Sequence, residues 1–257
     1  MLTKAKTLDG YKLHGVDGEI GKVKEFYFDD QYWTIRYLVV DTGNWLVGRL
    51  VLISPYALKS VNKEKKYISI NLTKQQIEKS PSHNSNKPVS RHFEEDYHGY
   101  YNWPRYWGGP YMWGSHSHIE PDLKQHKDFI IDKKSWDSHL RSTDDVSGHH
   151  IEATDGNIGH VEDFIIDDET WAIRYLIVDT QNFWPGKLVL VSPQWIERIS
   201  WPEKKIFINL SCESIKESPE YTEAFLLDRD YETGLYKHYN RKSYWTKESV
   251  SEKTILL

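Results

Sequence analysis

Two charged residues stand in the middle of the most apolar segments of this chain. Arg36 lies in the segment WTIRYLVVDT and Arg174 in WAIRYLIVDT, with Asp41 and Asp179 following five residues later. A charge in such a segment must face solvent or be paired, because an unpaired buried charge is costly. One hypothesis is a paired arginine–aspartate binding site at the mouth of the fold. We favour a structural interpretation, an outward arginine or a salt bridge that fixes strand register.

Histidines and carboxylates gather at three places where they could bind zinc or nickel. These places are the acidic run between His92 and His98, the segment GSHSH at 114–118 and the histidine pair at 149–150. No His-x-x-x-His spacing suits a helical metal site. We therefore expect solvated loop histidines, no metal and no cofactor.

Three other features have a structural explanation that we prefer. Gly18 and Gly21 have the wrong spacing for a dinucleotide loop, and no helix follows them, so Gly18 is expected in a turn that feeds a strand. The pair Asp29–Asp30 offers too few ligands for calcium and is expected in a solvated hairpin turn. Cys212 starts a short helix, where a thiol pKa can fall. The first copy has Lys74 at the matching position, so the repeated unit does not require a thiol and we assign Cys212 no role.

The positions of these features are set by an internal repeat. Residues 17–81 align with residues 155–219 without a gap, at an offset of 138 positions (174 − 36), and about 30 of the pairs are identical. Such self-similarity indicates two copies of one structural unit. Each copy predicts about five short strands separated by turns, followed by a short helix that Thr73 or Ser211 caps.

An aromatic tail follows each copy and belongs to the repeated unit. The candidate binding residues in these tails keep the same offset: Tyr101, Tyr106 and Trp107 with Tyr239, Tyr244 and Trp245. Asp96–Tyr97 aligns with Asp230–Tyr231 only after a shift of four residues, which predicts an irregular tail with a loop of variable length. We favour rings that pack on a sheet. A docking face for a partner and stacking on sugars or nucleic-acid bases are the alternatives.

The fold class expected from this pattern is all-β, with two tandem small barrels, because closure removes exposed sheet edges. An open two-layer sandwich is the alternative. Two copies in one chain should pack about a pseudo-two-fold axis. The domains predicted are a first barrel, an aromatic linker, a second barrel and an aromatic C-terminal tail, at residues 1–81, 82–125, 126–219 and 220–257.

Composition limits the function classes. A net charge of −5 without a basic patch argues against nucleic acid as a partner. No apolar stretch approaches the roughly 18 residues of a membrane span, and the N-terminal segment does not have the pattern of a signal peptide. One cysteine in 257 residues excludes an internal disulfide framework. We therefore expect a cytoplasmic protein.

The segments IGKVKEFYFDDQYWTIRYLVVDTG and IGHVEDFIIDDETWAIRYLIVDT resemble the PRC-barrel family. The shared pattern is Gly-x-Val, an Asp-rich hairpin and Arg-Tyr-Leu-Val-Val-Asp. The family is named for the cytoplasmic domain of the photosynthetic reaction centre H subunit, and its barrel also ends a ribosomal RNA maturation factor. The chain looks most like the double-barrel bacterial members. The resemblance implies a small β-barrel that docks onto proteins or assemblies, and it implies no shared catalytic residues.

We therefore expect a protein-binding or assembly module that is not an enzyme. A small-molecule or metal sensor, and a protein of photosynthetic assembly similar to the H subunit, are the alternatives. Another protein or a second copy of the chain is the expected partner, with a pseudo-symmetric monomer or a homodimer as the state. The copies differ at Trp45, Phe183 and Trp184, which we add to the candidate binding residues.

Overall fold

The computed structural model describes residues 1–46, 49–82, 89–108, 139–180, 186–222 and 227–245. Contacts between residues divide the chain into two compact units. Unit 1 comprises Met1, Thr3–Asp145 and Ile166–Ile173. Unit 2 comprises Leu2, Val146–Ile165 and Arg174–Leu257. The described residues form two sheets of seven strands, one for each copy of the repeat.

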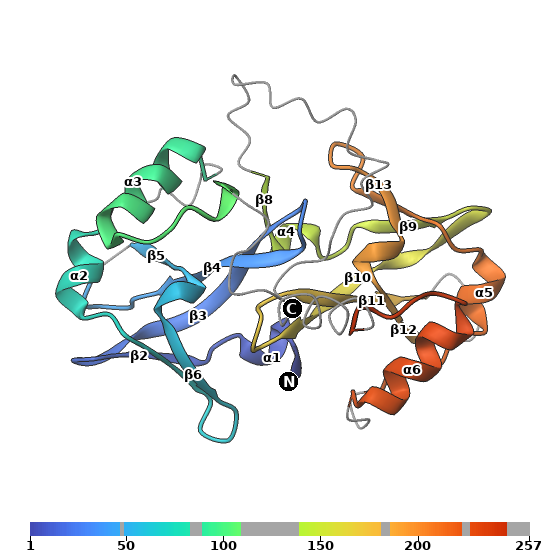
Figure 1. The fold of residues 1–257 in the computed structure, drawn as a ribbon, viewed down its shortest axis with the longest axis horizontal. Coiled ribbons are helices and arrows are strands. Elements are labelled where there is room, and N and C mark those ends of the chain that lie inside the picture. Colours follow the sequence, from blue (N-terminus) through green and yellow to red (C-terminus); the bar gives the residue numbers. More distant parts are fainter. Residues whose placement is uncertain (47–48, 83–88, 109–138, 181–185, 223–226, 246–257) are drawn as a thin grey trace, which may run out of the picture. The chain divides into compact units, whose positions relative to one another are not determined.

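The sheet of unit 1 follows the path β5-β4-β3-β2-β7-β6, with β8 paired to β3 (Figure 1). Among the described strands of this sheet, only β2 and β7 are parallel neighbours. Its strands are β2 (Lys12–Gly15), β3 (Gly18–Asp29), β4 (Thr34–Asp41), β5 (Leu50–Ile53), β6 (Leu58–Asn62), β7 (Tyr67–Ile70) and β8 (Leu140–Ser142). The accompanying helices and 3-10 turns are α1 (Ala5–Leu8), η1 (Pro55–Ala57), α2 (Lys74–Lys79), α3 (Arg91–Tyr101), η2 (Tyr106–Gly108) and α4 (Thr143–Val146).

Strand β4 is the centre of the unit 1 core, because seven of its eight residues are buried. Its β-branched and aromatic residues favour extended backbone. Strand β3 pairs with it from Lys22 opposite Asp41 onward. Gly21 lies next to this pair, where a Cβ atom would collide with the Asp41 carbonyl oxygen. The glycine of the Gly-x-Val motif therefore permits close approach of two strands.

The second sheet repeats this order as β12-β11-β10-β9-β14-β13. Its strands are β1 (Leu2–Lys4), β9 (His150–Ala153), β10 (Gly156–Asp167), β11 (Ile173–Asp179), β12 (Leu188–Val191), β13 (Ile196–Ser200) and β14 (Lys205–Ile208). The helices of this copy are η4 (Pro193–Trp195), α5 (Cys212–Lys216) and α6 (Arg229–His238). Gly159 has the same function as Gly21, because its Cβ would collide with the Asp179 carbonyl oxygen.

The all-β, two-copy prediction is confirmed, and the helix caps lie where the sequence places them. The Thr73 side chain and Gln76 form a capping box on α2, and Ser211 accepts a hydrogen bond from the Ser214 amide on α5. Closure differs from the expected barrel. Among the described residues no ladder joins β5 to β6 or β12 to β13, so each hydrogen-bonded path stays open.

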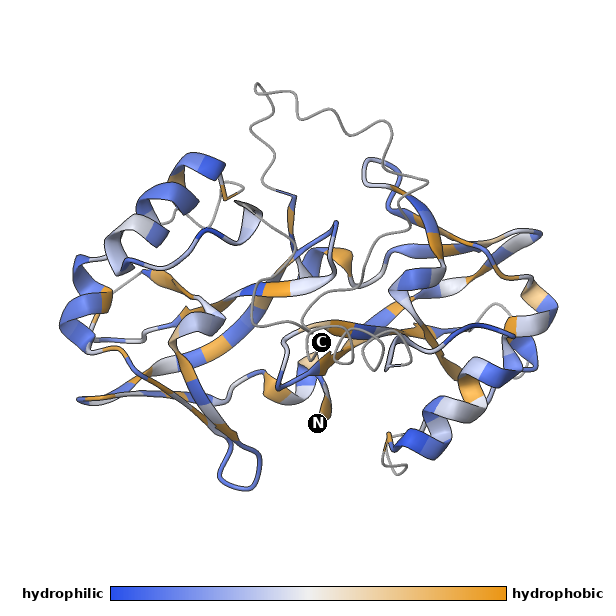
Figure 2. Ribbon diagram, in the orientation of Figure 1, coloured by the Kyte–Doolittle hydropathy of each residue, from blue (hydrophilic) through white to orange (hydrophobic). Residues whose placement is uncertain are grey.

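The prediction of irregular aromatic tails is wrong for the part of them that the structure describes. Helices α3 and α6 occupy that part, and Figure 2 shows both ribbons in mostly hydrophilic colours. The side chains of Ser90 and Asp228 cap their N-termini, and Asn102 ends α3 in the left-handed conformation, with φ of 54°. Both helices therefore begin at a side-chain cap, and α3 also ends at a left-handed residue.

Among the described residues no helix has both the length and the apolar character needed to cross a bilayer.

Candidate functional site

A buried carboxylate, Glu94 on α3, is the centre of a polar cluster in unit 1. Its side chain is 0% exposed. Glu94 Oε1 lies 3.1 Å from the Tyr37 hydroxyl oxygen on β4 and accepts a hydrogen bond from the Tyr106 hydroxyl of η2. Glu94 Oε2 forms an ion pair of 2.8 Å with Nη1 of Arg91, one turn earlier on α3. A sheet strand, a helix and a 3-10 turn thus meet at one carboxyl group.

Arg36 forms a second ion pair in the same cluster. Its Nη2 lies 3.1 Å from Asp29 Oδ2, and these side chains are 3% and 5% exposed. Asp29 also accepts hydrogen bonds from the Gln31 and Tyr32 amides, which closes the β3–β4 turn. Arg36 Nη1 has no hydrogen-bond acceptor among the described residues. The guanidinium carbon lies 4.1 Å from the Tyr106 ring centroid, so the face of this ring is its remaining partner.

His98 extends the cluster along α3. Its Nε2 lies 3.2 Å from the Tyr37 hydroxyl oxygen, and its Nδ1 lies 2.9 Å from the Pro104 carbonyl oxygen. The imidazole also packs edge to face with Trp107, at 5.3 Å between ring centroids. The ring is therefore held on three sides.

Burial moves the pKa values of this cluster in opposite directions. Burial raises the pKa of the Glu94 carboxyl to about 7, although Arg91 and the two tyrosine hydroxyls favour the charged form. Burial lowers the pKa of His98 to about 4, against the effect of the Pro104 carbonyl. In both cases the low-dielectric surroundings disfavour the charged form.

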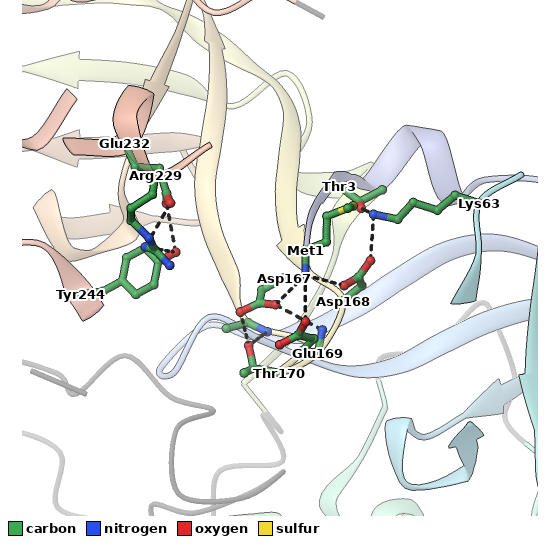
Figure 3. A network of polar contacts seen from close by, with 11 residues as sticks. Met1, Thr3, Lys63, Asp167, Asp168, Glu169, Thr170, Arg229, Glu232 and Tyr244 are labelled. Atoms are coloured by element: carbon green, nitrogen blue, oxygen red, sulfur yellow. Dashed lines mark hydrogen bonds and ion pairs between the residues drawn. The ribbon is translucent and has the colours of Figure 1, made fainter. Parts of the chain in front are cut away.

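Unit 2 contains the matching cluster around Glu232 on α6. Glu232 Oε1 accepts hydrogen bonds of 2.7 Å from the Tyr175 hydroxyl and 3.0 Å from the Tyr244 hydroxyl. Arg229 Nη1 forms an ion pair of 3.1 Å with Glu232 Oε2, which Figure 3 shows together with the Tyr244 ring. The Arg174 guanidinium lies 4.2 Å from the centroid of that ring. Each unit therefore fastens its helix to its sheet with the same set of side chains.

In unit 1 the strand arginine does not pair with the aspartate five residues later, contrary to one of our hypotheses. Arg36 is buried and pairs with Asp29, whereas Asp41 is exposed and accepts a hydrogen bond from the Gly43 amide. Arg36 lies near the β3–β4 turn and points into the core, where Asp29 at the end of β3 supplies a carboxylate, whereas Asp41 lies at the other end of β4. A salt bridge that fixes the strand was one of our structural alternatives. The expectation of a solvated Asp29 is wrong.

The remaining strand and loop candidates do not gather at one site among the described residues. Arg174 is buried beneath the Tyr244 ring, and Asp179 is partly exposed at the end of β11. Trp45 donates a hydrogen bond of 2.5 Å to the Ile20 carbonyl oxygen. Phe183, Trp184 and the histidines of GSHSH lie outside the described residues.

The tail candidates all contact side chains of their own unit. Tyr106 and Tyr244 are buried beside the strand arginines, Tyr239 is buried too, and Tyr101, Trp107 and Trp245 are partly exposed. In unit 1, Tyr97 joins the β4 and β5 core and donates a hydrogen bond of 2.7 Å to the Leu52 carbonyl oxygen. The rings therefore pack internally along this part of each tail, as our favoured interpretation states.

A depression of about 380 Å³ lies between α2 and the C-terminal end of α3 in unit 1. Its lining residues carry no charge and are Asn71, Leu72, Gln76, Tyr100, Tyr101 and Trp103. Tyr101 and Trp103 stack at 4.4 Å between centroids. Tyr100 is 42% exposed, and its hydroxyl donates a hydrogen bond of 2.9 Å to the Gln76 carbonyl oxygen. An exposed ring is thus fixed at the rim of an uncharged hollow.

The corresponding surface of unit 2 is built differently. His238 replaces Tyr100 and keeps the link between the helices through a 2.7 Å hydrogen bond to the Ser214 carbonyl oxygen. Arg241 replaces Trp103 and donates a hydrogen bond of 2.6 Å to the Asn209 carbonyl oxygen. The link between the two helices is kept, whereas the rings of Tyr100 and Trp103 belong to unit 1.

A network of surface charges also belongs to unit 1. Asp168 forms ion pairs with the Met1 amino group at 2.7 Å and with Lys63 Nζ at 2.8 Å (Figure 3). Lys63 also donates a hydrogen bond to the Thr3 hydroxyl. Asp168, in the turn between β10 and β11, therefore has two cationic partners.

Sequence reasoning missed the two acidic residues at the centre of the clusters. Arg91 and Glu94 align with Arg229 and Glu232 at the same offset of 138 as the sheets (232 − 94). The shift of four residues introduced at Asp96 concealed this match. An ungapped alignment through residue 107 was the signal that would have found both residues.

Comparison with known proteins identifies part of the chain. Residues 4–77, which lie in unit 1, match the PRC-barrel domain family. A search of curated proteins finds no match.

Proposed function

We propose that this chain, which contains a PRC-barrel domain at residues 4–77, is a non-enzymatic module that binds another protein. The observation that carries the proposal is the depression of unit 1, where Tyr100 stands exposed above uncharged lining residues. Tyrosine and tryptophan are the residue types most often found as anchors of protein interfaces. A ring that is already fixed loses little conformational entropy when a partner covers it.

The use of the buried polar groups supports a binding function over catalysis. In both units the carboxylate, the two arginines and the two tyrosine hydroxyls contact one another beneath the helix. Glu94 and Glu232 are almost fully buried, so a substrate would have to displace a helix to reach them. We therefore assign these duplicated residues to holding each helix in place.

Site-specific photo-crosslinking tests the proposal. The full chain would carry benzoylphenylalanine at Tyr100, and a matched control would carry it at His238 in unit 2. We expect one protein to be crosslinked from Tyr100 in its native cell extract and not from His238. The same set of proteins at both positions, or none at either, would exclude the depression as the docking site.

A second candidate function is binding of a small uncharged molecule in the same depression. Its volume of about 380 Å³ and the two amide side chains, Asn71 and Gln76, support this alternative. Native mass spectrometry of the protein isolated from its own cells distinguishes the two candidate functions. A retained small molecule adds a small defined mass, whereas a protein partner adds the mass of a polypeptide chain.

A further inference from the structure

In unit 1 the Tyr37 hydroxyl contacts both Glu94 and His98, which is one contact more than its single hydrogen can satisfy. The Tyr37 oxygen lies 3.1 Å from Glu94 Oε1 and 3.2 Å from His98 Nε2, so both contacts have hydrogen-bond distances. A tyrosine hydroxyl carries one hydrogen and can donate it to one of these atoms only. The other contact needs a hydrogen from the carboxyl group or from the imidazole.

The contact between the His98 ring and Pro104 determines which ring nitrogen carries the hydrogen. His98 Nδ1 lies 2.9 Å from the Pro104 carbonyl oxygen. A carbonyl oxygen only accepts, so Nδ1 carries the hydrogen of a neutral ring and Nε2 is left as an acceptor. If Glu94 is ionised and His98 is neutral, Tyr37 faces two acceptors with one hydrogen. The unmatched contact is then a repulsion between lone pairs in a buried site.

We propose that Glu94, Tyr37 and His98 form a proton-binding site, in which one additional proton locks α3 onto β4. With the proton on Glu94, the carboxyl donates to the Tyr37 oxygen, Tyr37 donates to His98 Nε2, and His98 Nδ1 donates to the Pro104 carbonyl. Every contact then has one hydrogen. A proton on His98 Nε2 satisfies the same chain with its direction reversed.

Neighbouring groups favour release of the proton and burial favours its retention, so release falls near neutral pH. Arg91 lies 2.8 Å from Glu94 and, with the hydroxyls of Tyr106 and Tyr37, favours the ionised carboxylate. The negative charge of Asp29 acts against ionisation. Burial opposes ionisation most strongly and raises the pKa of Glu94 to about 7. Because the groups interact, the proton belongs to the pair and not to one residue.

Unit 2 supplies a natural comparison. Tyr236 takes the place of His98, and its hydroxyl brings a hydrogen of its own, so the second cluster has no excess of acceptors. Tyr175 donates its hydrogen to Glu232 at 2.7 Å. The proton site is therefore a property of unit 1, and it goes beyond the proposed binding function, on which it does not depend.

Nuclear magnetic resonance of the full chain tests the proposal directly. The probes are ¹³C in the glutamate carboxyls and ¹⁵N in the histidine rings, followed between pH 5 and 9. We expect one proton on the Glu94–His98 pair at pH 6, the Nδ1–H form of His98, and release of that proton around pH 7. A Glu94 carboxylate and a neutral His98 together at pH 6 would overturn the proposal.

Amide hydrogen exchange then tests the lock. After correction for the intrinsic rates, α3 should exchange at least about five-fold faster at pH 8.5 than at pH 6.5, relative to α6. The matched variant is His98→Tyr, which copies unit 2 and removes the excess acceptor. It should shrink the difference at least about two-fold, and the remainder reflects the burial of Glu94. An α3 that responds to pH as α6 does in the parent protein would refute the lock.

Discussion

The hydroxyl oxygen of Tyr37 lies 3.1 Å from Oε1 of Glu94, and this contact joins the central strand of unit 1 to the helix that covers it. The same contact recurs in unit 2, where Tyr175 donates to Glu232 at 2.7 Å. The two residues of each pair are 57 positions apart, so the repeat carries a tertiary contact as well as a sequence pattern.

Removal of either central carboxylate should destabilise its unit. Glu94→Ala leaves the hydroxyls of Tyr37 and Tyr106 and an arginine without their acceptor, and we expect a loss of about 2–4 kcal/mol in the free energy of unfolding. Glu232→Ala should cost a similar amount. Urea unfolding measures both. The control is Asp96→Ala on the exposed face of α3, which should change stability by less than about 0.5 kcal/mol. Equal effects at positions 94 and 96 would show that the cluster does not hold the helix.

The opposite pKa shifts of Glu94 and His98 predict how stability depends on pH. The folded pKa of Glu94 is raised to about 7, so its stabilisation is complete below its unfolded value of 4.5 and is lost as pH rises through 7. The folded pKa of His98 is lowered to about 4, so its stabilisation is present above 6.5 and is lost as pH falls toward 4. Between pH 4.5 and 6.5 the two contributions oppose each other.

Two variants separate these contributions in urea unfolding at a series of pH values. His98→Gln should make the protein more stable with each step from pH 7.5 down to 5, because the Glu94 contribution then acts alone. Glu94→Gln should make it less stable over the range from pH 6.5 to 4.5. Parallel pH profiles for the parent and both variants would contradict the assigned pKa directions.

Two glycines of unit 1 should respond to alanine in opposite ways. Gly21→Ala places a Cβ against the Asp41 carbonyl oxygen, and we expect a loss of about 1–3 kcal/mol because two strands must separate. Gly99→Ala adds a methyl group to α3 with no atom within 4 Å and should stabilise by about 0.5–1 kcal/mol. Thermal unfolding measures both. A neutral Gly21→Ala would mean that β3 and β4 are not in the observed register.

The single cysteine should react slowly. Burial, followed by the neighbouring Asp155 carboxylate, raises the pKa of the Cys212 thiol to about 11. The reactive thiolate is then scarce at pH 8, and iodoacetamide labelling should be at least about ten-fold slower than for free cysteine. Asp155→Asn removes a negative charge and should accelerate labelling. A rate equal to that of free cysteine would show an exposed and unperturbed thiol.

The strand pattern of this chain could be predicted because local rules determine it. The β3–β4 hairpin follows from β-branched residues around an Asp-rich turn, and the α2 cap follows from Thr73 and Gln76. Closure into a barrel could not be predicted, because it depends on pairing between strands far apart in sequence.

The sequence did not predict the cluster around Glu94, and the reason differs from that for barrel closure. Its members come from β3, β4, α3 and η2, and their convergence depends on how α3 packs. From the sequence, Arg36 had either to face solvent or to be paired, and the structure shows the pair. The sequence could not choose Asp29 over Asp41, because that choice depends on which face of the sheet the helix covers.

The central claim is that unit 1 binds a protein through the depression beside Tyr100. Quantitative affinity capture with the tagged full chain tests it, in comparison with the double variant Tyr100→His and Trp103→Arg, which installs the residues of unit 2. The protein that crosslinks from position 100 should fall at least about ten-fold in the variant, while the melting temperature stays within about 3 °C of the parent. Undiminished capture of that protein by a folded variant would contradict the account.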